Sequence, residues 1–154
     1  MVQALHPWVH VMQPFAKIVV AVDFEAASQR AVDVAVAMSR ASGASVTLLH
    51  VYALPIAPYA EGLVWPAADF EAAAKRALER EIARVAGPGT HVEGAVRCGG
   101  AADQIIEVVK ELGADLVVMG THGRKGVSRM LLGSVAERVV RTSPVPVLTI
   151  PMPH

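Results

Sequence analysis

The alternation of short apolar runs with longer helical segments is the feature that most constrains this chain. The apolar runs are rich in Val, Ile and Leu, as expected for strands that are covered on both faces. Between them, apolar residues recur with near-helical spacing, and Gly43 gives the first of these segments a natural stop. The predicted strands are residues 15–22, 45–51, 91–97, 115–119 and 145–150, and the predicted helices are residues 28–42, 69–85, 101–112 and 131–141.

This order predicts an α/β fold, because strands that alternate with helices pair in parallel through right-handed crossovers. We expect a single-domain, doubly wound, Rossmann-like, five-stranded parallel sheet with four helices in residues 15–151, preceded by an N-terminal extension in residues 1–14. Asp69 is predicted to cap the second helix. Pro146 cannot donate to a central ladder, so the last strand is predicted to lie at an edge of the sheet.

Charge and hydropathy narrow the function classes. The formal net charge of the 154 residues is zero, which argues against the broad basic face of a nucleic-acid binder. The apolar runs are shorter than the roughly 18 residues that a membrane span needs. The lone Cys98 cannot form an internal disulfide, and we expect it to be buried or half-buried. These features predict a soluble, cytoplasmic protein that binds neither nucleic acid nor membrane. A small anionic ligand fits them better than a nucleic acid does.

A glycine-rich segment follows the predicted strand 115–119 and leads into the last predicted helix. Gly120 and Gly123 permit positive φ and close approach of the backbone to a ligand, and Gly133-Ser134 offers an amide and a hydroxyl near a helix start. Arg124 and its basic neighbours add positive charge. Turns also require glycine, so the segment alone fits a phosphate cradle or a simple turn. Its place at the carboxyl end of a strand favours the phosphate cradle.

A second polar group lies at the end of the first predicted strand. Asp23 follows that strand directly, where a ligand of a doubly wound sheet would lie. A carboxylate just before a helix also stabilises the helix dipole without any ligand. Both explanations of Asp23 remain open from the residues alone.

At this point the chain resembles the ATP-binding branch of the universal stress protein family, from about residue 15 to residue 150. The most specific element is the pattern G-x2-G-x9-G-[ST], which is met by Gly120, Gly123, Gly133 and Ser134. The strand that ends at Asp23, the strand end at residues 48–51 and residues 143–148 are also similar.

The resemblance implies a specific nucleotide site. It implies that the backbone of Val51 meets adenine, that Asp23 and Gly120 lie near the ribose, and that Gly123, Gly133 and Ser134 hold the phosphates. The residues that would complete this pocket are Ala21, Val22, Met119, Arg124 and Val135. The ligand implied is ATP or a related adenine nucleotide, with or without a divalent cation such as Mg²⁺, and the assembly implied is a homodimer through the last strand.

The chain departs from the family pattern at two positions. Glu25 stands where the family often has serine, which brings extra negative charge near the phosphates, and Ala101 stands where it often has proline. His122 resembles the histidine of the family's glycine segment, for which a role in stabilising the turn and one in acid–base catalysis are both open.

Three functions follow from these features. The leading hypothesis is a regulatory ATP-binding stress-response protein whose conformation or partner affinity changes with nucleotide occupancy. The first alternative is an enzyme, a slow ATPase or a nucleotidyl transferase, in which Asp23 places a metal and His122 assists proton transfer. The second alternative is a nucleotide-free dimeric interaction protein. No catalytic residue is assigned under the leading hypothesis.

Overall fold

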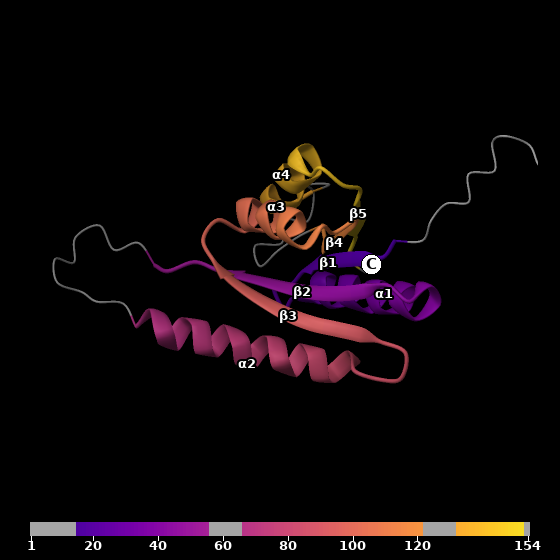
Figure 1. Ribbon diagram of the computed structural model, residues 1–154. Coiled ribbons are helices and arrows are strands. Elements are labelled where there is room, and N and C mark those ends of the chain that lie inside the picture. Colours follow the sequence, from indigo (N-terminus) through magenta and orange to yellow (C-terminus); the bar gives the residue numbers. More distant parts are fainter. Residues whose placement is uncertain (1–14, 56–65, 122–131, 153–154) are drawn as a thin grey trace, which may run out of the picture.

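The described residues form five strands, which lie in one parallel sheet with the order β3-β2-β1-β4-β5. The computed structural model describes residues 15–55, 66–121 and 132–152 (Figure 1). The predicted fold class is confirmed, because the sheet is doubly wound and four helices connect or follow its strands. The elements are β1 (Lys17–Ala21), α1 (Ala26–Ser42), β2 (Ser45–Tyr52), α2 (Ala67–Val85), β3 (His91–Cys98), α3 (Ala101–Leu112), β4 (Leu116–Gly120), α4 (Ser134–Thr142) and β5 (Val147–Ile150).

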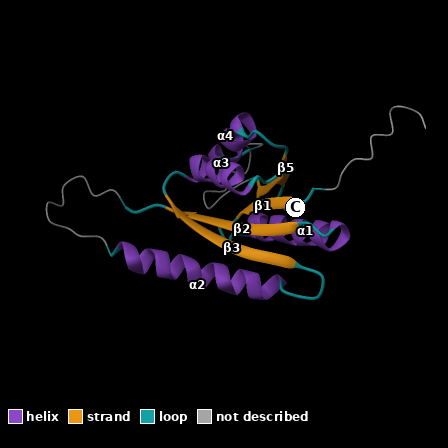
Figure 2. Cartoon of the chain, in the orientation of Figure 1, coloured by secondary structure: helices purple, strands orange, loops and turns teal. Residues whose placement is uncertain are grey.

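The helices cover both faces of the sheet, with α1 and α2 on one face and α3 and α4 on the other (Figure 2). Side chains alternate along the strands, so Ile18 and Val20 of β1 enter the core beneath α1, whereas Val19 enters the core beneath α3 and α4. All three are at most 1% exposed. A strand that is buried on both faces reads as a continuous apolar run, which is why the sequence predicts it well.

The strand order reverses between β1 and β4. The chain passes from β1 to β2 on one side, and returns after β3 to place β4 on the other side of β1. The helices that follow β1 and β4, which are α1 and α4, therefore diverge to opposite faces of the sheet. In an open parallel sheet this point of divergence is where ligands bind.

Helix α3 has its predicted bounds, whereas β1 and β5 each begin two residues later than predicted and the starts of the other three helices also differ. Helix α1 begins at Ala26 rather than residue 28, and α4 begins at Ser134 rather than residue 131. Helix α2 begins at Ala67, so the prediction that Asp69 caps it is wrong. Asp69 lies in the first turn, where its backbone amide donates to the carbonyl of Pro66 at 2.9 Å. Its carboxylate still suits the positive end of the helix dipole.

Strand β5 lies at an edge of the sheet, as Pro146 predicts. The chain enters β5 directly after this proline, whose carbonyl accepts the amide of Val117 at 3.0 Å. Proline keeps its acceptor while it lacks a donor, so it fits at the start of an edge strand. No helix within the described residues combines the length and apolar character that crossing a membrane requires.

A charged cluster joins α2 to α1 in a place that no periodicity indicates. Glu81 is only 6% exposed, and Arg84, one turn later, donates to its carboxylate at 2.6 Å. The same guanidinium donates to Asp33 of α1 at 2.8 Å. The hydrogen bond to Glu81 raises the pKa of Arg84 above its ordinary value, so the guanidinium stays charged. The buried carboxylate of Glu81 therefore keeps a permanent cationic partner.

Removal of Arg84 tests how much its ion pair with the buried carboxylate of Glu81 contributes to the free energy of unfolding. We expect Arg84→Met to lower the free energy of unfolding by about 2 kcal/mol, because it leaves the carboxylate of Glu81 buried without its cation. Urea denaturation measures this change. The double variant Glu81→Met/Arg84→Met is the control and should recover most of the loss. A single variant as stable as the wild type would show that the cluster contributes nothing.

Candidate nucleotide site

The turn after β1 is held by the side chain of Asp23. Its Oδ1 accepts the backbone amide of Glu25 at 2.9 Å, and its own amide lies 3.3 Å from Oγ of Ser28. Ser28 Oγ donates in turn to the carbonyl of Glu25 at 3.1 Å. A carboxylate has about four acceptor positions, so this hydrogen bond leaves Asp23 with capacity for a ligand. The structure therefore gives Asp23 a role in the turn that is compatible with ligand binding.

Phe24 has a backbone conformation that the sequence gives no sign of. Its φ is 67°, in the left-handed region that bulky residues rarely adopt and that costs about 1–3 kcal/mol. Its ring lies 4.6 Å from the ring of His50, centroid to centroid. His50 Nδ1 lies 2.7 Å from the carbonyl of Val22, so this nitrogen carries the proton. These contacts fix the turn and the neighbouring Asp23.

Gly120 ends β4 in close contact with the first turn of α1. A Cβ added there would lie 2.8 Å from Cβ of Ala27 and 3.0 Å from its carbonyl carbon. Gly120 does not use the positive φ that a glycine permits. The absent side chain instead allows α1 to approach the sheet at the point where the strand order reverses.

Strands β1 and β4 end side by side, within one residue of each other in the register. Ala21 and Met119 are partners in the parallel register, and the amide of Val22 extends the ladder by donating to Leu49 at 2.8 Å. The side chains of Val22 and Met119 are each 4% exposed and enter opposite cores. A ligand at these strand ends would therefore meet the backbone of Val22 and Met119 rather than their side chains.

The start of α4 lies beside these strand ends. The amide of Gly133 donates to the carbonyl of Thr121 at 2.6 Å, and the amide of Thr121 donates to Ile150 at 2.9 Å. The amide of Gly133 is thus already used within the protein. Helix α4 has no side-chain cap, and the first amides of a helix have no partner within it. Ser134 and Val135 are exposed at this positive end of the helix dipole.

The end of β2 carries Val51, which is half-buried and packs against the core beneath α3. The next residue, Tyr52, pairs in register with Cys98 of β3. Two effects raise the pKa of the Tyr52 phenol: partial burial, which is the larger, and the neighbouring Cys98. The hydroxyl of Tyr52 therefore stays protonated at neutral pH. Cys98 itself is exposed, which contradicts the expectation of a buried or half-buried residue, because β3 is an edge strand that ends at this position.

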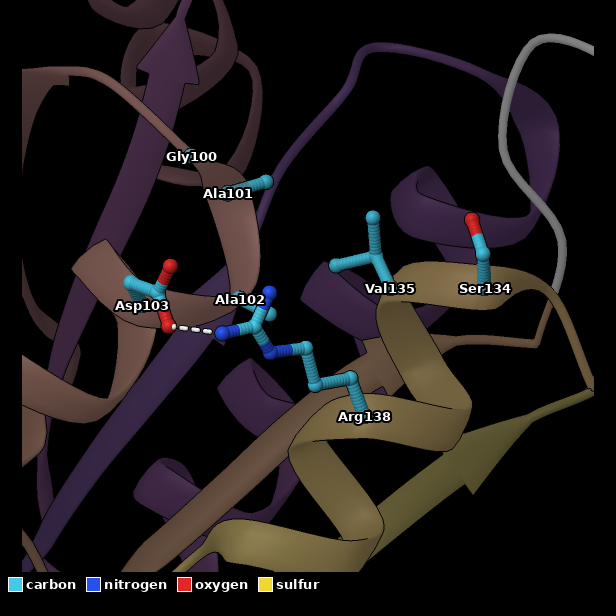
Figure 3. A pocket seen from close by; sticks show the side chains of 7 residues that line it. All are labelled: Gly100, Ala101, Ala102, Asp103, Ser134, Val135 and Arg138. Carbon is cyan, nitrogen blue, oxygen red and sulfur yellow. Dashed lines mark hydrogen bonds and ion pairs between the residues drawn. The ribbon is translucent and has the colours of Figure 1, made fainter.

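A hollow of about 210 Å³ opens between the starts of α3 and α4 (Figure 3). Figure 3 shows Arg138 of α4 reaching across to Asp103 of α3, where Nη2 donates to Oδ1 at 2.7 Å. The sequence pattern contains no signal for this hollow, because it depends on how two helices pack. The lining residues are Gly100, Ala101, Ala102, Asp103, Ser134, Val135 and Arg138.

The fold brings most of the predicted site residues to one edge of the sheet. Gly123 and Arg124 lie outside the described residues, as do His122 and the extension at residues 1–14. Within the described part of the chain, no group of three His, Cys, Asp or Glu side chains is arranged to hold a metal ion. The predicted residues at the carboxyl edge are Ala21, Val22, Asp23, Val51, Met119, Gly120, Gly133, Ser134 and Val135.

Comparison with known proteins identifies the family. Residues 14–151 match the model of the universal stress protein family. The chain belongs to the universal stress protein family. A universal stress protein from Thermus aquaticus is 36% identical over 136 residues, which are 88% of this chain and 98% of that protein. A shorter match to Universal stress protein MJ0531 from Methanocaldococcus jannaschii is 49% identical over 55 residues, which span 36% of this chain and 32% of that protein.

Solved structures of universal stress proteins share the fold. One, in complex with cAMP, has a TM-score of 0.64 and 28% sequence identity, and the match covers 89% of this chain and 97% of that chain. Another, from Archaeoglobus fulgidus in complex with dAMP, has a TM-score of 0.64 and 26% identity, and the match covers 89% of this chain and 98% of that one. The ligands of both structures are adenine nucleotides.

The contact of Gly120 with α1 gives a test of the local packing. We expect Gly120→Ala to lower the free energy of unfolding by about 1–3 kcal/mol, because the added Cβ meets the backbone of Ala27 and α1 must shift. Urea denaturation measures the change. Gly87→Ala is the matched control, since its Cβ would meet only a side-chain nitrogen of Arg40 at 3.5 Å. Equal stability of the two variants would contradict the packing role.

Proposed function

We propose that this universal stress protein is a cytoplasmic regulatory protein of the stress response that binds ATP, alone or with a divalent cation such as Mg²⁺. One observation carries the proposal: β1 and β4 end side by side, next to the start of α4, which has no side-chain cap. Strand ends supply backbone groups and a carboxylate, and the helix start supplies amides that suit phosphate oxygens. The cAMP and dAMP complexes of related proteins support an adenine nucleotide as the ligand.

The proposal gives a role to each of the predicted residues at the carboxyl edge of the sheet. The backbone of Val51 meets adenine, and Asp23 lies near the ribose with Gly120. Phosphates lie at Ser134, Gly133 and the sequence-predicted Gly123. Because the amide of Gly133 is engaged with Thr121, Gly133 acts through its small size, and the amides of Ser134 and Val135 act as donors. The pocket is completed by Ala21, Val22, Met119, Arg124 and Val135.

Regulation fits the site better than catalysis does. Oδ1 of Asp23 and Nδ1 of His50 both hold the turn after β1, which is an arrangement for positioning rather than for proton transfer. A bound nucleotide would contact the turn that leads into α1 and also the start of α4. These two helices cover opposite faces of the sheet, so nucleotide occupancy would couple the two layers.

The proposal includes a homodimer formed through β5. This strand is an edge of the sheet, and its backbone is open to pairing. Large apolar side chains are exposed on it and near it: Leu148 is 37% exposed, Val140 of α4 is 46% exposed, and Met152 is 45% exposed. Pairing of two copies across a twofold axis would cover the edge and these side chains.

Two substitutions at Ser134 separate its amide from its hydroxyl. Ser134→Pro removes both groups without disturbing the helix, because Gly133 is extended, with ψ at 161°, and the first helical position tolerates proline. Ser134→Ala removes only the hydroxyl. By isothermal calorimetry we expect the proline variant to lose about tenfold or more in ATP affinity and the alanine variant about threefold.

The melting temperatures of both variants without ATP should match that of the wild type, which controls for folding. ATP should also raise the melting temperature of the wild type, since a ligand stabilises the state that binds it. Binding by Ser134→Pro at wild-type affinity would contradict the role of α4. A wild type that binds no ATP would reject the proposed function and leave the interaction-protein alternative.

The dimer has its own test. We expect the wild type to show twice the 16.2 kDa chain mass by light scattering at micromolar concentration, and Leu148→Glu to show the monomer mass, because two buried charges would face each other. Ala73→Glu, on the exposed face of α2, is the matched control and should remain dimeric. A monomeric wild type would remove the dimer from the proposal and leave nucleotide binding untouched.

A further inference from the structure

The hollow between α3 and α4 adjoins the proposed phosphate site. Ser134 and Val135, the proposed phosphate donors, form one wall, and the start of α3 at Gly100 and Ala101 forms the other. Neither helix has a side-chain cap, so both present unpaired first-turn amides toward this region. A phosphate at the start of α4 would therefore have further space beside it, lined by donors, on the side toward α3.

Arg138 places a guanidinium in this space. It lies one turn after Ser134 on α4, and its guanidinium is held by Asp103 on the side of the hollow toward α3. Figure 3 shows its side chain extending between the two helices to Asp103. Arg138 is thus the cation of the hollow, and Asp103 is its present partner.

The ion pair between Arg138 and Asp103 can be broken at little cost in stability, which leaves Arg138 able to bind another anion. Its side chains are 61% and 58% exposed, and exposed ion pairs contribute little to stability. A terminal phosphate carries more negative charge than one carboxylate and matches the fork of donors on a guanidinium. A phosphate that enters the hollow can therefore take Arg138 away from Asp103 at small cost.

We propose that Arg138 is the residue that distinguishes a triphosphate from a monophosphate, by leaving Asp103 and binding the terminal phosphate in the hollow. This inference rests on the proposed nucleotide site. A monophosphate ends at the start of α4 and does not extend to Arg138, whereas a triphosphate has two further phosphates to place. Asp103 opposes this exchange, because it competes for the guanidinium and repels the phosphate.

Calorimetry with ATP and with AMP tests the proposal. We expect Arg138→Gln to bind ATP about tenfold more weakly and AMP within about twofold of the wild type. Asp103→Asn should bind ATP more tightly than the wild type, because it frees the guanidinium. Arg141→Gln is the matched control: this arginine lies on the same helix, pairs with Glu137 at 3.8 Å and does not line the hollow. It should change neither affinity.

Three results would overturn the inference. Equal loss of ATP and AMP affinity in Arg138→Gln would assign the residue to general binding, and unchanged affinities would remove it from the site. Weaker ATP binding by Asp103→Asn would mean that the ion pair only positions the two helices. In all three cases the wild type still binds nucleotide and the proposed function stands. A wild type that binds neither ATP nor AMP overturns the proposed function together with this inference.

Discussion

The parallel pairing of β1 with β4 is the constraint on which the rest of the structure depends. It places two strands side by side whose following connections run to opposite faces of the sheet. The helices that follow these two strands, α1 and α4, lie on opposite faces of the sheet, and an open parallel sheet binds its ligands at such a point. Gly120 lets α1 contact the strand end, so a ligand at this edge of the sheet would meet backbone rather than a side chain of Gly120. A site of this kind recognises a ligand mainly through groups that every residue possesses, and only a few side chains add specificity.

The two helices that follow β1 and β4 are attached to the sheet in different ways. Helix α1 lies close to it, because Ala27, Ala31 and Ala35 are fully buried small residues. Helix α4 is short, with Ala136 and Val139 as its buried residues, and its start is fixed by the hydrogen bond from Gly133 to Thr121. Its exposed side carries Arg138. A ligand bound between a tightly packed helix and a lightly packed one has a physical means to move the second against the first.

The sequence predicts the strands well, because burial on both faces leaves a local apolar pattern that can be read residue by residue. It predicts helix starts less well. Helix α4 begins three residues later than predicted because Gly133 is extended, with ψ at 161°, and its amide donates to the carbonyl of Thr121, twelve residues earlier in the chain. Helix α2 begins before Asp69, and the burial of Glu81 within it follows from Arg84 and from Asp33 on another helix. Such partners leave no periodic signal.

The sequence by itself determined the alternation of strands and helices, the parallel sheet, the edge position of β5 and the glycine pattern that resembles the family's phosphate motif. Only the tertiary structure decided why Gly120 is needed, that Phe24 adopts a positive φ, and that Arg138 faces Asp103 across a hollow. The physical reason is the range of the interactions. Hydrophobic periodicity is a property of neighbouring residues. The contact between β4 and α1, and the meeting of α3 with α4, depend on the order in which distant strands pair.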